Sequence, residues 1–244
     1  MRELHVETFR AHASPFLRHH ADPDTTRRVW ISGSAAVIDG ARNRPGDPAH
    51  LSVVTGVGPA IDLDPLLATV GREIDTPWRF TIEHASRRAL PDSWRSPTTE
   101  HWHWMWTRTM PRRSDEQVEE VTSAAAIDAI LDAANPDSFA RPDTPGVETW
   151  LGVRDGKRLV GVGALLRQSD GTGHLRGVTV LPDYAGGGRG RVISTGLTRL
   201  ALSRGSGVAT LSVNDDNDPA LAIYRRLGYR VAHSFASGAP APSA

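Results

Sequence analysis

The sequence predicts a mixed α/β fold (α+β), in which strands and helices alternate along most of the chain. The alternation is clearest after residue 149, where β-branched and apolar segments are interrupted by two segments of helical periodicity. A second observation is the Asp155-Gly156 pair, which is typical of a tight turn between two antiparallel strands. We expect strands over 149–154, 158–167, 174–181, 208–213 and 229–235, and helices over 191–204 and 219–227.

The first half of the chain carries weaker signals for the same two kinds of element. Asp62 or Asp64 is the expected N-terminal cap of one helix. Three segments are polar or rich in Gly and Pro and are expected to be irregular: 42–48, 111–117 and 135–146. Helices are expected over 8–20, 64–74, 85–90 and 124–134, and strands over 28–39, 50–56, 78–83 and 101–106.

The chain length of 244 residues fits one large domain or two small ones. With residues 111–117 as the linker, we expect an accessory lobe over residues 1–112 and a second domain over 118–236. Residues 237–244 read Ser-Gly-Ala-Pro-Ala-Pro-Ser-Ala and cannot bury apolar surface, so a disordered tail is expected there.

The composition argues against several classes of protein. The chain has no Cys, which excludes disulfides, thiolate metal sites and a Cys nucleophile. Its formal net charge is zero, whereas nucleic-acid binders normally carry a basic face. The first residues are charged, and no stretch approaches the roughly 20 apolar residues of a membrane span. We therefore expect a cytoplasmic protein that binds neither nucleic acid, nor membrane, nor metal.

A glycine-rich loop between a strand and a helix carries the clearest chemical signal. The segment Val178-Thr179-Val180 leads into the loop Gly186-Gly187-Gly188-Arg189-Gly190-Arg191. Glycine permits close backbone approach, and a helix start offers free N–H groups, so the loop favours a phosphate or pyrophosphate. The two arginines add charge-assisted contacts. A plain flexible connector is the alternative, whereas the glycine spacing fits neither a dinucleotide fold nor a P-loop.

A second segment with a characteristic order of residues follows the loop. It contains the strand Leu211-Ser212-Val213, then Asn217, Ala220, Tyr224 and Gly228-Tyr229. Together with Pro182-Asp183-Tyr184 and the glycine loop, this order resembles the GNAT superfamily of N-acetyltransferases. The resemblance covers the chain from about residue 148 to about residue 235. It implies a mixed, mostly antiparallel twisted sheet flanked by helices.

The resemblance also implies acetyl-CoA as co-substrate and a role for each matching residue. Val178, Thr179 and Val180 would offer backbone groups to the pantetheine arm and the acetyl carbonyl. Asn217 would contact the pantetheine, or only cap the next helix. Tyr224 would protonate the leaving thiolate as general acid, or only pack in the core. The pyrophosphate would be cradled by Gly186, Gly187, Gly188, Arg189, Gly190 and Arg191.

Two positions depart from the family's pattern. Ala185 stands where the family has Arg or Gln, although the resemblance implies that the phosphate contacts are mainly made by backbone groups. Ser212 stands where the family often has a catalytic Glu, and a hydroxyl is a poor general base at neutral pH. The amine proton would then leave through a water chain or through His174, Glu148, Asp215 or Asp216.

The leading functional hypothesis is an N-acetyltransferase in which a primary amine attacks the thioester directly. Its acceptor would be a small-molecule or peptide amine, and the enzyme would be a monomer or a homodimer. Ala185 and Ser212 favour an alternative, a catalytically inactive CoA-binding or scaffolding protein with the same fold. A longer-chain acyltransferase is a third possibility.

Residues 1–110 follow a layout similar to that of tandem GNAT proteins whose first lobe has lost acetyl-CoA binding. Residues 51–58 would be the counterpart of the cofactor strand, without the glycines of a phosphate loop. In the strand 101–106, His101 and His103 would face one side and the tryptophans the other. The tryptophans would pack in the core or line an acceptor pocket, and the two histidines would also be compatible with a metal.

Overall fold

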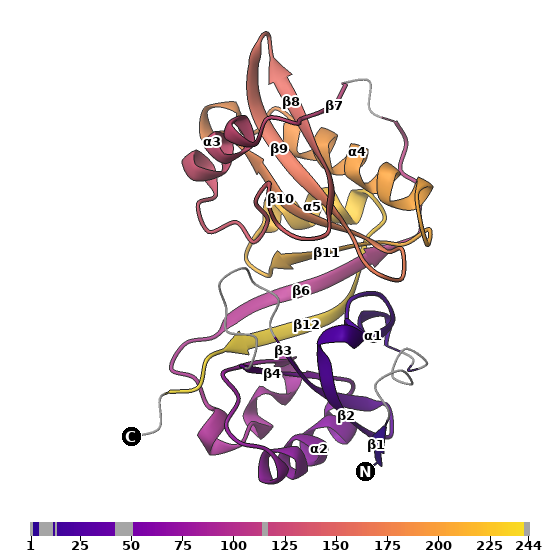
Figure 1. Cartoon of the computed structure of the whole chain (residues 1–244), viewed down its shortest axis with the longest axis vertical. Helices are drawn as coiled ribbons and strands as arrows, with labels where there is room; N and C mark the ends of the chain where they lie inside the picture. The colour runs from indigo at the N-terminus through magenta and orange to yellow at the C-terminus, as the bar shows by residue number, and fades with distance from the viewer. Residues whose placement is uncertain (1, 5–11, 13, 42–50, 114–116, 242–244) are drawn as a thin grey trace. The chain divides into compact units, whose positions relative to one another are not determined.

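The structure is a computed structural model that describes residues 2–4, 12, 14–41, 51–113 and 117–241. The chain forms two compact units (Figure 1). Unit 1 comprises Met1–Trp104 and Val231–Ala244, and unit 2 comprises Met105–Arg230. The chain passes between them twice, within strand β6 (Glu100–Thr107) and at the start of strand β12 (Arg230–Gly238).

Unit 1 is built on a mixed sheet with the strand order β1-β2-β3-β4-β5-β12-β6. Its first five strands are β1 (Arg2–Leu4), β2 (Thr26–Ser32), β3 (Ala35–Ala41), β4 (Ser52–Val57) and β5 (Arg79–Glu83). The pair β4–β5 is parallel, and helix α2 (Ala60–Glu73) makes the crossover that such a pair needs. The α2 side chains Leu63, Leu67 and Val70 are fully buried in one cluster with Trp30 and Phe80.

Four sequence predictions for unit 1 are corrected by the structure. The strand predicted over 28–39 is a hairpin, because Gly33 has a φ of +55° and turns the chain between β2 and β3. The predicted Asp cap of α2 is wrong: Pro59 occupies the cap, and Asp62 accepts a hydrogen bond from the Ser34 backbone N at 2.9 Å. The helix predicted over 85–90 is a 3-10 helix, η3 (His84–Ala89).

The fourth correction concerns the helix predicted over 8–20. Only α1 (Pro15–His19) forms among its described residues, and residues 8–11 and 13 lie outside them.

Unit 2 contains a second mixed set of strands with the order β11-β10-β9-β8-β7. Only the β10–β11 pair is parallel, and α4 (Arg189–Ser203) is its crossover helix. The helix lies close to β9, since a Cβ on Gly163 would be 2.8 Å from Ile193 Cγ2 and 2.9 Å from Leu197 Cδ1. The other elements are β7 (Glu119–Glu120), α3 (Ala124–Ala134), β8 (Val147–Asp155), β9 (Arg158–Arg167), β10 (Gly173–Val180), β11 (Ala209–Asn214) and α5 (Asp218–Arg226).

These elements confirm the predicted fold class, a mixed and mostly antiparallel sheet flanked by helices. The hairpin at Asp155-Gly156 is confirmed by the register Asp155↔Arg158 of β8 with β9. The predicted helix over 124–134 coincides with α3.

The compact units divide the chain at other positions than the predicted domains, whose boundaries at 112–118 and at 236 stay predictions. Ser237 and Gly238, predicted to begin a disordered tail, belong to β12. Ser237 is held there because its Oγ accepts a hydrogen bond from Trp102 Nε1 at 2.9 Å and lies 2.7 Å from Thr81 Oγ1. Residues 242–244 lie outside the described part.

Deleting residues 1–110 is expected to give insoluble protein, because the deletion removes β5, the antiparallel partner of β12. Phe235 and Ala236, which are 1% and 0% exposed, would then lose the strand and the core that cover them. The soluble fraction of a fragment that starts at residue 111 measures this. A soluble and fully active fragment would contradict the prediction.

Candidate acyl-CoA site

The two parallel strands of unit 2 separate after three paired positions. β10 pairs with β11 at Gly173↔Ala209, His174↔Thr210 and Leu175↔Leu211, while β10 continues to Val180. Val180 pairs with β9 on the other side, opposite Gly161. The backbone edge of β10 beyond Leu175 therefore has no β11 partner in the described part of the chain. Backbone N–H and C=O groups need hydrogen-bond partners. Those on this edge have none from β11, so a ligand can pair with them.

A bulge in β10 lies at the point where the strands separate. The register with β9 shifts between Arg176 and Thr179, and Gly177 in the bulge has a φ of +59°. A Cβ on Gly177 would lie 3.1 Å from Ser138 Oγ, so the backbone there approaches the segment after α3 closely. Gly177 is not among the predicted site residues, although a glycine inside a β-branched strand is a signal for a bulge.

Thr179 is fixed by two hydrogen bonds within unit 2. Its Oγ1 accepts from Asn135 Nδ2 at 3.2 Å and donates to the Gly177 carbonyl at 3.1 Å. Its side chain is buried, whereas Val178 and Val180 are half-buried. Of the three predicted residues on β10, Thr179 thus uses its side chain to brace the bulge, which leaves only its backbone for a ligand.

The glycine loop ends at the start of α4 without a side-chain cap. Gly186 and Gly188 have φ values of +80° and +78°, a conformation that favours glycine, and Gly188 is the N-cap residue. The first intrahelical bond at this end runs from Val192 N to Gly188 O at 3.1 Å. The N–H groups of Arg189, Gly190 and Arg191 consequently have no intrahelical acceptor, which is the arrangement that binds anions.

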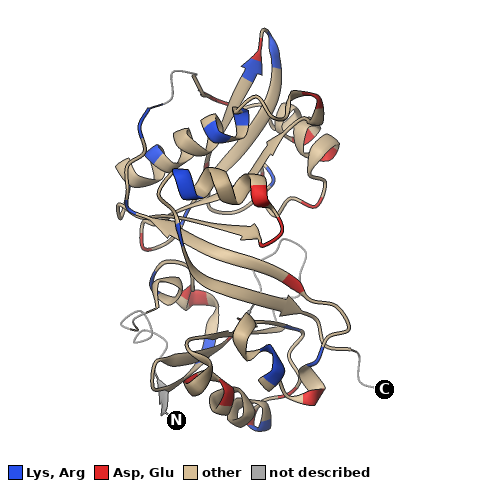
Figure 2. Cartoon of the chain, turned by 180° about the vertical axis from the view of Figure 1, so that it is seen from behind, with Lys and Arg blue, Asp and Glu red and all other residues tan. Residues whose placement is uncertain are grey.

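The two arginines of the loop have different surroundings. Arg189 pairs with Asp155 at 3.2 Å, donates to the Tyr184 carbonyl at 3.4 Å and lies 5.4 Å from the Tyr184 ring centre. Arg191 is exposed and pairs with no carboxylate in the described part of the chain. Helix α4 contains basic residues along its length and no acidic residue (Figure 2). Arg191 is therefore the guanidinium with the freer access to a phosphate.

Tyr224 lies on α5 and is almost fully buried in the core of unit 2. Its hydroxyl is hydrogen-bonded with Ser194 of α4, and burial raises the pKa of Tyr224 to about 12. The ring centre is 5.8 Å from that of Tyr229 in an edge-to-face arrangement. At neutral pH the phenol is therefore protonated, as a proton donor must be.

Asn217 acts as the N-cap of α5. Its Oδ1 accepts a hydrogen bond from Ala220 N at 3.2 Å, and Pro219 lies in the first turn. The second of the two roles considered for Asn217, helix capping, is therefore present in the structure.

The candidate proton acceptors occupy different environments. Ser212 is exposed on β11, and Asp215 and Asp216 are exposed in the turn before α5. His174 is 1% exposed and its Nδ1 lies 2.8 Å from Thr210 Oγ1, on the paired part of β10 and β11. Burial among paired strands makes His174 a poor relay to solvent, so the exposed aspartates are the better candidates.

Glu148 is held in two ion pairs, with Arg167 at 2.6 Å and with Arg204 at 3.4 Å. The hydrogen bond from Arg167 is the main reason that the pKa of Glu148 lies below its ordinary value, and Arg204 lowers it further. A carboxylate with a lowered pKa is a weaker base, which argues against Glu148 as the proton acceptor.

Glu148→Gln is expected to leave turnover within about threefold and to lower the free energy of unfolding by about 1 kcal/mol. Because the folded pKa is lowered, this stabilisation is present above the ordinary pKa and is lost as the pH falls through the folded value. Steady-state kinetics measures turnover, and denaturant unfolding at pH 7 and pH 3.5 measures the stability and its dependence on pH. Glu119→Gln, which breaks the more exposed pair with Arg154, is the matched control and should change stability less. A large loss of turnover in Glu148→Gln would contradict the prediction.

The histidines of β6 are engaged with hydroxyl groups of unit 1. His101 Nε2 lies 3.0 Å from Thr99 Oγ1, and His103 Nδ1 lies 3.0 Å from Ser234 Oγ. On the same strand, Trp104 is fully buried and packs edge-to-face on Phe16. Among the described residues, no group of three or more His, Cys, Asp or Glu is arranged to hold a metal ion.

No described helix is long and apolar enough to cross a membrane.

Comparison with known proteins identifies the fold and the family. Solved structures that are similar along most of the chain include an acetyltransferase from the GNAT family of Colwellia psychrerythraea, with 12% identity, a TM-score of 0.57, and coverage of 99% of this chain and 100% of that one. A GCN5-related N-acetyltransferase from Kribbella flavida has 17% identity, a TM-score of 0.54 and 91% coverage of both chains. A tandem GNAT protein from the clavulanic acid biosynthesis pathway has 13% identity, a TM-score of 0.51, and coverage of 98% and 94%.

No curated protein matches the chain in sequence. The model of the acetyltransferase (GNAT) family matches residues 98–229, more than half of the 244 residues, and this segment contains the separated strands, the glycine loop and Tyr224. The chain belongs to the GNAT acetyltransferase family, which implies acyl-CoA-dependent acetyl transfer.

Proposed function

We propose that the chain is an N-acetyltransferase that moves an acetyl group from acetyl-CoA to a primary amine. The observation that carries this proposal is the separation of β10 from β11 beside the uncapped start of α4. The separated strand edge offers backbone groups to an extended acyl-pantetheine arm, and the helix start offers N–H groups to a pyrophosphate.

The residues of the loop fit a pyrophosphate. A Cβ on Gly186 would meet no atom within 4 Å, and one on Gly188 would meet only Arg191 Nη2 at 3.7 Å. The backbone face of the loop is therefore open to a ligand at Gly186 and Gly188, whereas the Arg189 side chain covers it at Gly187, where a Cβ would lie 2.6 Å from Arg189 Nη1. Within this proposal Gly186, Gly187, Gly188 and Gly190 provide the approach, and Arg191 provides the counter-charge.

When bound, acetyl-CoA supplies the acetyl group as an activated thioester. In the proposed reaction, the amine nitrogen attacks the thioester carbonyl, and backbone N–H groups near Val180 stabilise the oxyanion. The carbon–sulfur bond then breaks, and Tyr224 gives its proton to the thiolate. The surplus proton on the nitrogen leaves through water towards Asp215 or Asp216, both exposed, and Tyr224 regains a proton from water.

A second candidate function is a CoA-binding protein without turnover, which the exposed Ser212 favours because it supplies no general base. A thiol-release assay with acetyl-CoA and a panel of peptide, amino-sugar and small-molecule amines separates the two. Amine-dependent thiol release supports the acetyltransferase. Tight CoA binding without release, over the whole panel and from pH 6 to pH 10, would leave only the second function.

We also propose that the N-terminal lobe, residues 1–112, is a degenerate GNAT-like repeat that binds no second acetyl-CoA. Three features of α2 support this: Pro59 at the cap lacks an N–H group, Asp62 places a carboxylate in the first turn, and that carboxylate already binds Ser34 N. A negative charge at this position repels a phosphate. Calorimetry with acetyl-CoA should give one site per chain, and two sites would refute the proposal.

A further inference from the structure

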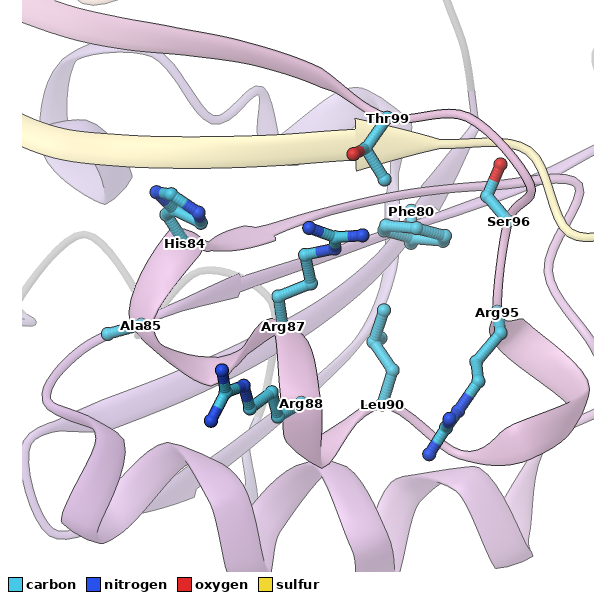
Figure 3. A pocket seen from close by; sticks show the side chains of 9 residues that line it. All are labelled: Phe80, His84, Ala85, Arg87, Arg88, Leu90, Arg95, Ser96 and Thr99. Atoms are coloured by element: carbon cyan, nitrogen blue, oxygen red, sulfur yellow. The ribbon is translucent and has the colours of Figure 1, made fainter.

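Unit 1 has a pocket of its own, on the side of β5 where the two 3-10 helices follow one another (Figure 3). Its volume is about 720 Å³, within the range of small-molecule sites, which is roughly 300–1,000 Å³. The helix η3 and the segment after η4 (Asp92–Trp94) supply most of its wall. The lining residues are Phe80, His84, Ala85, Arg87, Arg88, Leu90, Arg95, Ser96 and Thr99.

The wall of this pocket is strongly basic. Three arginines and a histidine line it, and no carboxylate does, although the whole chain has a formal net charge of zero. Figure 3 shows the guanidinium of Arg87 between His84 and Phe80, with Arg88 and Arg95 on either side of Leu90. Like charges around one cavity repel each other, and an anion inside it would remove that repulsion.

The arginines of the pocket have little competition from protein carboxylates. Arg87 and Arg88 are exposed and form no ion pair within the described ranges. Arg95 pairs with Asp92 at 3.0 Å, but the two side chains are 66% and 92% exposed, so this pair is weak and easily exchanged. Two or three guanidinium groups are thus available to one ligand, and guanidinium binds phosphate and carboxylate in a bidentate manner.

The floor of the pocket is apolar. Phe80 is fully buried and Leu90 is 5% exposed, and Ala85 adds a third apolar side chain. The hydroxyl of Ser96 donates to the Thr98 carbonyl at 2.5 Å, which leaves its oxygen as an acceptor at the rim. A free inorganic ion would use the charges and leave the floor unfilled, whereas an organic anion would use both.

We propose that unit 1 binds a small organic anion in this pocket, with a phosphate or carboxylate group held by Arg87 and Arg88 and an apolar part on Phe80 and Leu90. The glycine loop of α4 belongs to unit 2, so the two anion sites consist of different residues. The proposal gives the N-terminal lobe a ligand of its own that is not the acetyl donor.

Calorimetry on the full chain tests the proposal with two aromatic dianions, phenyl phosphate and phthalate. At least one should bind in a saturable manner, and the tighter of the two identifies the preferred anionic group. Arg87→Gln/Arg88→Gln should weaken that binding at least about tenfold, the loss expected when charge-assisted hydrogen bonds are removed. Arg72→Gln changes an exposed arginine of the same unit that does not line the pocket, and should leave the affinity within about twofold.

A second variant separates this site from the loop of unit 2. Gly188→Val should lose acetyl-CoA and keep the dianion, whereas Arg87→Gln/Arg88→Gln should do the reverse. Circular dichroism checks that the double variant is folded, which is expected because both side chains are exposed. The proposal is overturned if neither dianion binds up to about 10 mM, since a site of that weakness has no specific role. It is equally overturned if the folded double variant binds both as the wild type does.

Discussion

Gly188→Val is expected to abolish measurable acetyl-CoA binding, a loss of at least about 100-fold in affinity. Gly188 has a φ of +78°, and a β-branched residue in that region costs about 1–3 kcal/mol. The larger effect is on the ligand: the valine side chain would occupy the open backbone face at the start of α4. In the free protein a Cβ there meets only Arg191 Nη2 at 3.7 Å, so the chain should still fold. Calorimetry with acetyl-CoA gives the affinity directly.

Gly207→Val is the matched control for this experiment. Gly207 has a φ of +70° in the turn after α4, and a Cβ there would have no atom within 4 Å. This variant carries the same kind of backbone strain without touching the loop, so it should bind acetyl-CoA as the wild type does. If Gly188→Val kept its affinity, the pyrophosphate would lie elsewhere and the proposed site would be wrong.

The helices and strands that the sequence predicts well are those with sustained periodicity. The helix over 124–134 coincides with α3, because Ile127, Ile130 and Leu131 repeat on one buried face. The strand over 101–106 lies within β6, although the adjacent Trp104 and Met105 are both buried, so that burial there does not follow the predicted alternation of the two faces. Periodicity alone could not detect the hairpin at Gly33, since runs of apolar residues stand on both sides of the two-residue turn and do not alternate with polar ones.

The candidate site could be predicted as a set of residues but not as a geometry. The loop and Tyr224 follow from a sequence pattern, whereas the end of β10–β11 pairing at Leu175↔Leu211, just before the bulge at Gly177, does not. The partner of Arg189 is Asp155, which comes from the β8–β9 turn and has no signal in the sequence. The Arg189 side chain, which the sequence pattern assigns to the ligand, thus also forms an ion pair within the protein.

Contacts between residues far apart in the chain could also not be predicted from the sequence. In unit 1, Ser14 Oγ lies 2.9 Å from His233 Nε2, across 219 positions of the chain. The other nitrogen of this imidazole is hydrogen-bonded to Glu83 of β5. Phe16, Trp104 and Phe235 surround the ring, so a buried polar chain ties α1, β5 and β12 together. Each residue type is common on its own, and only the folded chain brings the three together.

Tyr224→Phe is expected to lower turnover by roughly 100- to 10,000-fold while acetyl-CoA affinity changes by less than about threefold. The substitution removes only the hydroxyl and keeps the ring that packs in the core of unit 2. The pKa of Tyr224 is raised to about 12 by burial, so the wild-type phenol keeps its proton throughout the working range. The rate should therefore show no loss from ionisation of Tyr224 between pH 6 and pH 10. Steady-state kinetics with the best amine of the panel, together with calorimetry, separates the two effects.

Tyr229→Phe is the control that distinguishes chemistry from packing. Tyr229 is also buried, its ring contacts Tyr224, and its hydroxyl lies 3.0 Å from Thr198 Oγ1. Both variants lose one buried hydrogen bond, at a cost of about 1–2 kcal/mol in unfolding free energy. They should therefore lose similar stability, while only Tyr224→Phe loses turnover by two or more powers of ten, since only its hydroxyl is the proposed proton donor. Equal, small losses of turnover in the two variants would make Tyr224 a packing residue and assign the proton to water or to another donor.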